Sequence, residues 1–214
     1  MDLTDGYISS FEPELDINLK EIEKYGIDNG VPIIRLSSRS VLRFLIKSRK
    51  PGRILEIGTA IGFSACYMAK YSEPGTKIKT IEKMPERAKI AAENIKKTNN
   101  SDIISLYEGD ACEIMEKMCE EGEKFDFVFM DAAKAQYSNY LKYIRKLLVS
   151  DGILLTDNIL QEGSVAQSKF SVARRDRTIH QRMREFLDEM MRSDEFNSMI
   201  VPVGDGMLIS TINR

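Results

Sequence analysis

The sequence predicts an α/β protein built on a doubly wound, mostly parallel sheet. Between residues 53 and 158, five short apolar segments alternate with helical ones. This alternation is typical of a parallel sheet with helices on both faces. Two later apolar segments, 196–203 and 206–212, meet at Gly204-Asp205-Gly206, which is a hairpin signal. We therefore expect a mixed sheet whose final strands include an antiparallel one.

The first 50 residues are expected to form helices. Apolar residues are set among charges in ELDINLKEIEKYG (14–26), and SSRSVLRFLIKSRK (37–50) is amphipathic. Ser37 or Ser38 suits the cap of the second helix, and Pro51-Gly52 ends it. No catalytic task falls to these helices, so we expect them to cover the site or to form a dimer contact.

The middle of the chain supplies strands and helices in turn. Pro85 suits the first turn of one of these helices. The expected strands are RILEIG (53–58), KIKTIE (77–82), DIISLYEGD (102–110), FDFVFMD (125–131) and DGILLTDN (151–158). The expected helices are 63–72, 85–98, 111–122 and 136–148. With 214 residues in all, we expect a single domain, 1–214.

Composition excludes several classes of protein. The net charge of −2 argues against general attraction to nucleic acid, although a local basic patch is compatible with it. The three cysteines form no CxxC pair and there is one histidine, which argues against structural zinc and for reduced thiols. No apolar run approaches the roughly 20 residues that span a bilayer, and no signal peptide is evident. We expect a cytoplasmic protein with no membrane segment.

Polar side chains follow the strands at the edge where ligands bind. In doubly wound sheets, that edge is the one beyond the carboxyl ends of the strands, near the switch point. The residues concerned are Glu56–Gly62, Glu82, Asp110, Asp131 and Asp157-Asn158. One acid at a strand end is unremarkable, but a series on one edge predicts a binding site.

The stretch EIGTAIGFS (56–64) joins the first strand to a helix. Gly58 and Gly62 allow a tight turn and a close approach of backbone to ligand. Their G-x-x-x-G spacing differs from the dinucleotide motif, so we favour another nucleoside-containing cofactor over a plain turn. Glu82 ends the next strand and suits ribose hydroxyls, although it would also suit a helix cap.

The third strand ends in EGDA (108–111). Asp110 suits the amino group of adenine, and Ala111 leaves room for the ring. This signal is weak alone, because aspartate is also a good helix cap.

Asp131, Asp157 and Asn158 form the expected chemical centre. They follow the fourth and fifth strands, which should be neighbours, and they offer only oxygen ligands. Such a set suits Mg²⁺, while the alternative is two capping acids with no metal. Lys134 lies close by in sequence, and a neighbouring dication would disfavour its ammonium form and make it a base. Without the metal, Lys134 would be a solvated cation.

A basic segment follows the fifth strand. Arginine forks suit phosphates, and the alternative is a solvated helix face. His180 in this segment is expected to be structural or phosphate-facing rather than catalytic. The cations are Lys169, Arg174, Arg175, Arg177, Arg182 and Arg184.

The motifs LEIGTAIGFSA, IE, GDA, MDAAK and TDN occur in an order that resembles the cation-dependent S-adenosylmethionine O-methyltransferases, the group of catechol and caffeoyl-CoA enzymes. The resemblance extends from about Ile33 to the C-terminal hairpin and implies a Rossmann-like methyltransferase fold with a seven-stranded sheet. It implies that Ser64 holds the methionine carboxylate and that Ile34 flanks the site. It also implies metal ligation by Asp131, Asp157 and Asn158, with Lys134 as base. The cofactor site would comprise Ile34, Glu56, Gly58, Thr59, Ser64, Glu82, Asp110, Ala111 and Asp131.

The sequence departs from the plant caffeoyl-CoA enzymes at two places. Those enzymes commonly have D-A-D-K where this chain has Asp131-Ala132-Ala133-Lys134, so the second acid is absent. The segment RRDRTIHQRMREF (174–186) is instead similar to bacterial tRNA 5-hydroxyuridine methyltransferases, which make wobble 5-methoxyuridine. In that interpretation Arg174, Arg175 and Arg177 hold substrate phosphates.

We therefore expect Mg²⁺-dependent methyl transfer from S-adenosylmethionine to 5-hydroxyuridine in the tRNA anticodon loop, by a homodimer. A 5-hydroxyuracil and a catechol both present two adjacent oxygens to one metal ion. The alternative is therefore the same chemistry on a small catechol or phenolic acyl-CoA. A nucleotide-binding module without catalysis, or a nicotinamide oxidoreductase, is a third hypothesis that the glycine spacing disfavours.

Overall fold

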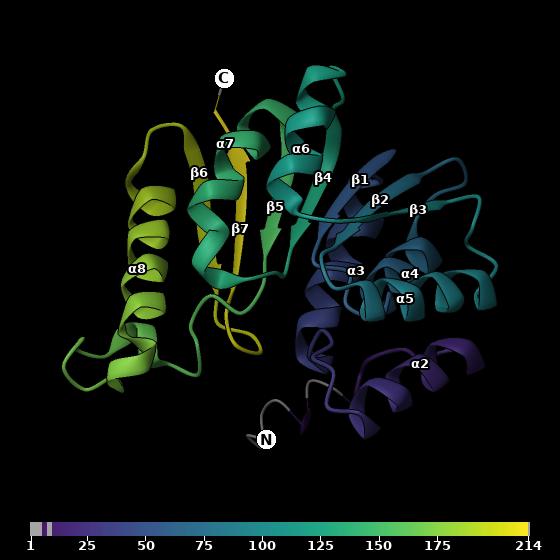
Figure 1. Cartoon of the computed structure of the whole chain (residues 1–214), viewed down its shortest axis with the longest axis horizontal. Coiled ribbons are helices and arrows are strands. Elements are labelled where there is room, and N and C mark those ends of the chain that lie inside the picture. The colour runs from purple at the N-terminus through teal and green to yellow at the C-terminus, as the bar shows by residue number, and fades with distance from the viewer. Residues whose placement is uncertain (1–5, 8–9, 214) are drawn as a thin grey trace.

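Seven strands form one mixed sheet in the part of the chain that the structure describes, residues 6–7 and 10–213 of a computed structural model. Figure 1 shows the sheet between helices, with the two outer strands β3 and β6 far apart. The strand order is β3-β2-β1-β4-β5-β7-β6. The strands are β1 (Arg53–Ile57), β2 (Lys77–Glu82), β3 (Ile104–Glu108), β4 (Phe125–Met130), β5 (Leu148–Thr156), β6 (Phe196–Val201) and β7 (Met207–Ile212).

The first five strands are parallel to one another, and of the last two only β7 runs in the opposite direction. β1 pairs in parallel with both β2 and β4, so the chain winds outward from it in two directions. β7 lies between β5 and β6 and is antiparallel to both. The predicted doubly wound, mostly parallel seven-stranded sheet with an antiparallel C-terminal hairpin is confirmed, as is the pairing of β4 with β5.

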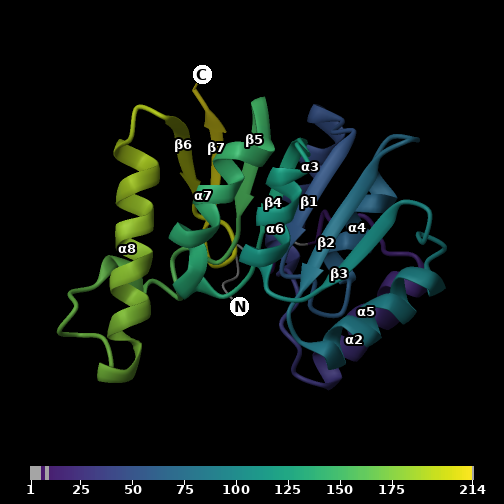
Figure 2. The ribbon, with the colours of Figure 1, turned by 45° about the horizontal axis from the view of Figure 1, so that its top comes forward.

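Helices cover both faces of the sheet, as Figure 2 shows. Residues of α2 to α5 share one apolar cluster with one face, and residues of α6 to α8 share a second cluster with the other. The helices are α2 (Ile17–Asp28), α3 (Leu36–Arg49), α4 (Phe63–Tyr71), α5 (Pro85–Lys97), α6 (Ala111–Glu120), α7 (Tyr137–Leu147) and α8 (Arg177–Arg192).

β4 shows why the sheet needs both layers. Phe127 and Phe129 are fully buried in the cluster of α2 to α5, while Val128 and Met130 are fully buried in the other cluster. Side chains alternate between faces along a strand, so an unbroken apolar run is typical of a strand covered on both sides. Burying each such side chain contributes about 1.5–3 kcal/mol.

The N-terminal helices begin at different signals. The Asp16 carboxylate accepts a hydrogen bond from Leu19 N at 3.0 Å and caps α2. The predicted cap at Ser37 or Ser38 is wrong, because α3 begins at Leu36 and Arg35 occupies the cap position. Ser38 lies in the first turn with its hydroxyl 3.4 Å from Asp157 Oδ1, so it faces the sheet instead of the helix end.

Element boundaries differ slightly from those expected. β3 starts at Ile104, because residues 101–103 form a turn, and it stops before Asp110, which caps α6. β5 starts at Leu148, directly where α7 ends, and it continues past Asp151, whose φ is 62°. Among the described residues, no helix has the length and apolar character required to cross a membrane.

Candidate active site

A pocket of about 1060 Å³ lies at the carboxyl ends of the parallel strands. A volume near 1000 Å³ is large for one small ligand and suits a nucleoside-sized molecule with a partner. One wall comes from residues between Pro32 and Ala111, and the other from residues between Asp131 and Asp205. The predicted site residues among its lining are Ile34, Gly58, Thr59, Ser64, Glu82, Ala111, Asp131, Lys134 and Asn158.

The glycine turn after β1 packs tightly against the end of β4. Gly58 has φ of +101°, and a Cβ there would lie 2.1 Å from the backbone oxygen of Asp131. Gly62 caps α4 in the left-handed region with φ of +83°. Ser64 therefore sits in the first turn of a helix, where backbone N–H groups lack intrahelical partners and attract anions.

Glu82 is held rigidly at the end of β2. Its Oε2 accepts a hydrogen bond from Ala60 N at 2.7 Å, and its Oε1 accepts one from Met84 N at 2.9 Å. The side chain is buried yet lines the pocket. These two bonds tie the glycine turn to the β2 end, and they leave lone pairs for ligand hydroxyls.

Glu56 does not line the pocket. It is fully buried in β1, where its Oε2 accepts a hydrogen bond from the Thr80 hydroxyl, which also bonds to Thr59 Oγ1. Burial raises the pKa of Glu56 to about 7, and hydrogen bonds from Ser64 and Thr80 oppose that rise. Glu56 therefore lies behind Thr59 and Ser64, and its contact with a cofactor stays a prediction.

Asp110 and Ala111 lie at the end of β3 in different roles. Asp110 Oδ1 accepts a hydrogen bond from Cys112 N at 2.9 Å and caps α6. Lys83 Nζ lies 2.9 Å from Asp110 Oδ2, and this partner and the capping bond lower the pKa of the carboxyl. Ala111 lines the pocket, whereas Asp110 is not part of its lining. Asp110 thus caps α6, and its contact with adenine stays a prediction.

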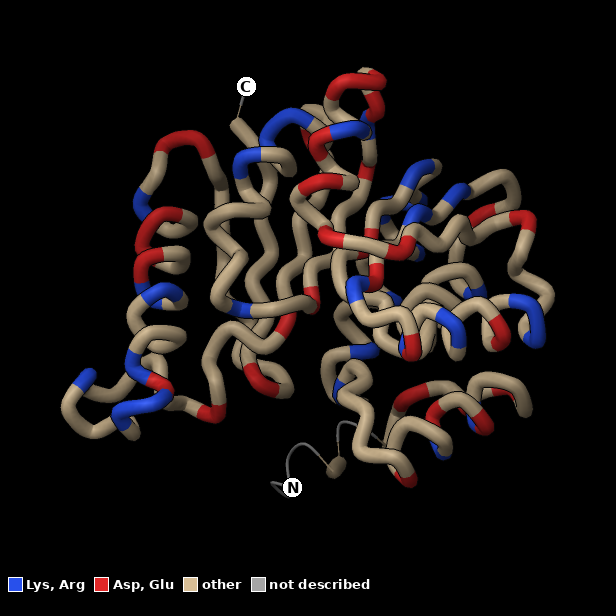
Figure 3. Tube along the Cα trace, in the orientation of Figure 1, with Lys and Arg blue, Asp and Glu red and all other residues tan. Residues whose placement is uncertain are grey.

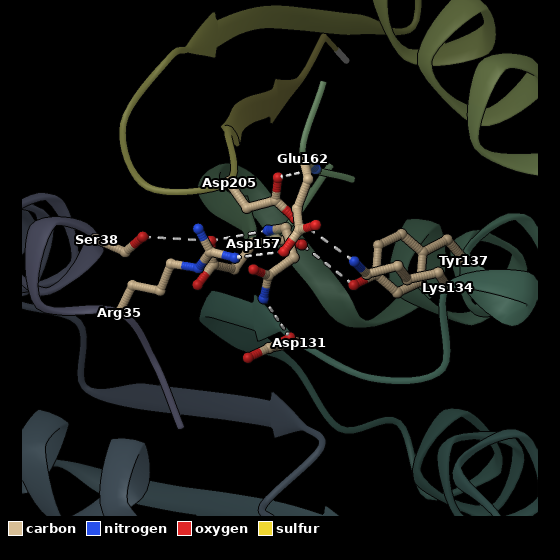
Figure 4. Close-up of polar contacts among 9 residues, drawn as sticks. Arg35, Ser38, Asp131, Lys134, Tyr137, Asp157, Glu162 and Asp205 are labelled. Atoms are coloured by element: carbon tan, nitrogen blue, oxygen red, sulfur yellow. Dashed lines mark hydrogen bonds and ion pairs between the residues drawn. The ribbon is translucent and has the colours of Figure 1, made fainter. Parts of the chain in front are cut away.

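The three predicted metal ligands lie where β4 and β5 end, and Figure 4 shows Asp131 and Asp157 there. Asn158 Nδ2 donates to Asp131 Oδ1 at 3.0 Å, and Asp157 N donates to Met130 O at 3.0 Å. Asp131 and Asn158 line the pocket, whereas Asp157 is fully buried and does not. Asp157 Oδ1 accepts bonds from Ser38 and from Asn158 N, and its Oδ2 is buried without a hydrogen-bond partner among the described residues.

The electrostatics of this cluster suit a cation. Burial raises the pKa of Asp157 to about 7, and the negative charge of Asp131 contributes to the rise. Burial also raises the pKa of Asp131, against the effect of Asn158 and Lys134. In the described part of the chain, no three His, Cys, Asp or Glu side chains form a metal cluster. A cation would therefore need the Asn158 amide oxygen, which a half-turn of the amide presents in place of nitrogen.

Lys134 has a partner that the sequence did not suggest. Its Nζ lies 3.7 Å from Oδ2 of Asp205, which is 5% exposed in the turn between β6 and β7. Asp205 also accepts a hydrogen bond from Glu162 N, and Figure 4 shows it facing Glu162. At the same edge, Arg35 Nη2 lies 3.6 Å from Glu162 Oε1. The only sequence signal at Asp205 is G-D-G, which predicts a turn. It does not indicate that the carboxylate also pairs with Lys134.

The predicted phosphate-binding arginines lie beside the pocket and not in its lining. Arg174 and Arg175 are exposed in a short 3-10 turn (Arg174–Asp176), and Arg177 Nε donates to Val172 O at 3.2 Å. Their neighbours Val172, Asp176 and Ile179 do line the pocket. Figure 3 shows lysine and arginine gathered at the start of α8. His180 is buried and bonds to Gln167 O at 3.3 Å, as its expected structural role requires.

The chain is similar to known proteins in both sequence and fold. The sequence profile of a family described as O-methyltransferase matches residues 8–212. A catechol O-methyltransferase of Niastella koreensis is 29% identical over 164 residues, which cover 75% of this chain and 74% of that protein. A caffeoyl-CoA O-methyltransferase of Petroselinum crispum is 30% identical over 172 residues, covering 78% and 71%. The S-adenosylhomocysteine-bound methyltransferase PaMTH1 of Podospora anserina superposes with a TM-score of 0.85 at 26% identity, covering 99% and 94%.

Proposed function

The chain belongs to the O-methyltransferase family and is an S-adenosylmethionine-dependent O-methyltransferase, and from this premise we propose its acceptor and its metal. The acceptor is a small catechol or a phenolic acyl-CoA thioester, and a divalent cation, Mg²⁺, assists the transfer. One observation carries the proposal. The Asp131–Asn158 pair and Lys134 line the same pocket as Gly58 and Glu82, so cofactor and acceptor groups share one cavity.

The first pocket wall, formed by lining residues between Pro32 and Ala111 and called the cofactor wall below, supports the position of S-adenosylmethionine. Glu82 offers lone pairs for ribose hydroxyls, and Ser64 lies at the open N-terminus of α4, which suits a carboxylate. Ala111 leaves room beside the end of β3 for a flat ring. S-adenosylmethionine supplies a methyl group on a positively charged sulfur, and the chain's part is to hold that methyl in line with the acceptor oxygen.

The fit of the polar cluster to Mg²⁺ supports the metal. Asp131, Asp157 and Asn158 supply hard oxygen donors, and the buried, unpartnered Oδ2 of Asp157 is the atom that a cation would satisfy. Bound there, Mg²⁺ would lower the pKa of the acceptor hydroxyl and orient its oxygen. In its uncharged form, Lys134 Nζ, which lies near Asp205, would accept the proton from that hydroxyl.

The names of the relatives and the character of the pocket support a small acceptor. The similar proteins are called catechol and caffeoyl-CoA O-methyltransferases. Two neighbouring oxygens, as in a catechol, would share one cation and so present one oxygen to the methyl group. Arg35 and Lys134 at the pocket edge would tolerate the phosphates of an acyl-CoA.

The second candidate acceptor is 5-hydroxyuridine at the tRNA wobble position, giving 5-methoxyuridine. The observation in its favour is the exposed Arg174 and Arg175 beside the pocket-lining Asp176. Exposed arginine side chains next to the pocket lining would contact the phosphates that flank an anticodon base turned into the pocket.

One set of methylation assays separates these proposals. The purified protein is incubated with labelled S-adenosylmethionine and, separately, with catechol, caffeoyl-CoA or tRNA that carries 5-hydroxyuridine. We expect methyl transfer to a small acceptor that EDTA stops and Mg²⁺ restores. Methyl transfer to tRNA alone would contradict the proposed small acceptor and favour 5-hydroxyuridine. Methyl transfer that continues in EDTA would contradict the proposed dependence on Mg²⁺.

The double variant Arg174→Glu/Arg175→Glu is the matched control for the acceptor. If the acceptor is small and uncharged, this charge reversal should leave its methylation within about twofold, because exposed charges contribute little at a distance. A tenfold loss confined to tRNA methylation would favour the tRNA acceptor.

A further inference from the structure

Arg39 is a buried cation in α3 that the methyl-transfer chemistry does not use. Its side chain is 4% exposed, and its Nη2 lies 2.7 Å from Glu23 Oε1 of α2. Its Nε donates to the backbone oxygen of Ile34 at 3.3 Å. Its guanidinium carbon lies 4.4 Å from the ring centre of Phe63, the first residue of α4. One planar group therefore joins three separate segments of the chain.

Two of those three contacts fall on residues that line the pocket. Ile34 and Phe63 both line the cofactor wall, whereas Arg39 and Glu23 do not. Phe63 directly precedes Ser64, so a shift of its ring would move the first turn of α4. α2 packs against α4, and its Glu23 forms an ion pair with Arg39 of α3.

A guanidinium is suited to this arrangement and an ammonium is not. Arginine is planar with donors in a fixed fork, so it can bind a carboxylate, donate to a carbonyl and stack on a ring at once. Burial of such a charge costs free energy that the ion pair recovers only in part. The ion pair is thus weak as a source of stability, and its effect lies in fixing the three partners relative to one another.

We propose that Arg39 is a positioning residue for S-adenosylmethionine. With Glu23 it holds the Ile34 backbone and the Phe63 ring in the arrangement that accepts the cofactor, and it makes cofactor affinity depend on the docking of α2. The inference rests on the pocket being the cofactor site. It requires neither the metal nor the acceptor proposed above.

The same helix supplies a matched control. Arg43 lies one turn further along α3, its Nη2 is 3.0 Å from Glu12 Oε1, and its guanidinium carbon lies 6.0 Å from the Tyr71 ring centre. Arg43 thus makes an ion pair and a ring contact of the same kind. None of Arg43, Glu12 and Tyr71 lines the pocket.

The test measures binding of S-adenosylhomocysteine by calorimetry, together with thermal unfolding, for four variants. We expect Arg39→Met to weaken binding about tenfold, equivalent to about 1.4 kcal/mol, and Glu23→Gln and Arg39→Lys to weaken it about threefold to fivefold. Arg43→Met should change the affinity by less than twofold even where it lowers the unfolding temperature as much. In methyl transfer, KM for S-adenosylmethionine should rise more than kcat falls.

Two results would overturn the inference. One is an unchanged affinity in both Arg39→Lys and Glu23→Gln, the variants least at risk of failing to fold. The other is equal weakening by Arg43→Met, which would mean that any ion pair on α3 acts only through stability. Binding of S-adenosylhomocysteine needs no metal and no acceptor, so failure of either of those proposals would leave these affinities unchanged.

Discussion

At the scale of single residues, Glu56 makes the stability of the free protein depend on pH. Its carboxyl is fully buried with a pKa raised to about 7, and its Oε1 has no hydrogen-bond partner in the described structure. In the unfolded chain the same carboxyl ionises near its ordinary value of 4.5. Between these two values the native state binds more protons than the unfolded state, so the free energy of unfolding falls as pH rises.

Glu56→Gln should flatten this dependence. Below pH 4.5 the contribution of Glu56 is fully present, and by pH 7 it is lost, a change on the order of 3 kcal/mol. The variant removes the titration and keeps the shape of the side chain. Urea unfolding at several pH values should therefore show a smaller fall in stability between pH 5 and 7 for Glu56→Gln. Parallel curves for the two proteins would contradict the buried titration.

Asp157→Asn tests the polar cluster separately from the cofactor wall. Asp157 is fully buried outside the pocket lining, so its replacement by an amide of the same size should leave S-adenosylhomocysteine affinity within about twofold. Methyl transfer should fall about 100-fold or more, because a charged ligand is lost. Single-turnover assays and calorimetry measure the two effects. Loss of cofactor binding in this variant would argue against a role in metal binding.

At the scale of elements, the turn from β1 to α4 depends on Gly58 for space as well as for conformation. Gly58→Ala places a Cβ 2.1 Å from the backbone oxygen of Asp131, so the end of β4 must move. Gly75 offers the matched control, because its φ is also positive, +92°, and no atom of the described residues lies within 4 Å of a Cβ there.

Gly75→Ala should cost about 1–2 kcal/mol of stability, the strain of a left-handed residue alone. Gly58→Ala should cost several kcal/mol more or prevent folding, because backbone atoms overlap. Urea unfolding of the two variants gives the difference directly. Equal losses would mean that the β4 end yields easily to the added methyl group.

At the scale of the whole molecule, the N-terminal helices expose apolar side chains. Ile17, Ile27 and Phe44 of α2 and α3 are each 68% exposed. That the N-terminal helices form a homodimer contact stays a prediction, as does the expectation that residues 1–214 form one domain.

Light scattering tests the dimer. The unaltered protein should have a mass near twice 24.4 kDa, and Phe44→Glu should shift it towards 24.4 kDa, because a buried charge opposes association. A monomer at every concentration measured would contradict the prediction and leave the N-terminal helices as a cover for the cofactor wall.

The sheet and its binding edge could be predicted because strand signals are local. An apolar run such as residues 127–130 indicates burial on both faces, and the polar residue that follows it marks the carboxyl end. Asp131, Asn158, Gly58 and Glu82 therefore fall in the lining as that rule places them.

The remaining site residues depend on tertiary packing that the sequence does not encode locally. Arg39 occupies a helix among other cations, and it is buried by packing against α2, the Ile34 backbone and the Phe63 ring of α4. Ser38 is of a residue type that often caps helices, but its hydroxyl is directed at Asp157. Glu56 lies in the strand that the motif predicts, but its side chain is buried behind the pocket. A sequence motif gives the position of a residue along a strand and does not give the contacts of its side chain.

The division of the pocket between the two halves of the sequence has a practical consequence. Its first wall ends at Ala111 and its second begins at Asp131, with only α6, the turn after it and β4 in between. A chimaera of two relatives joined once within residues 121–124 would thus inherit each wall whole from one parent. Such recombinants offer a route to new acceptor preferences without redesign of the half that is expected to bind the methyl donor.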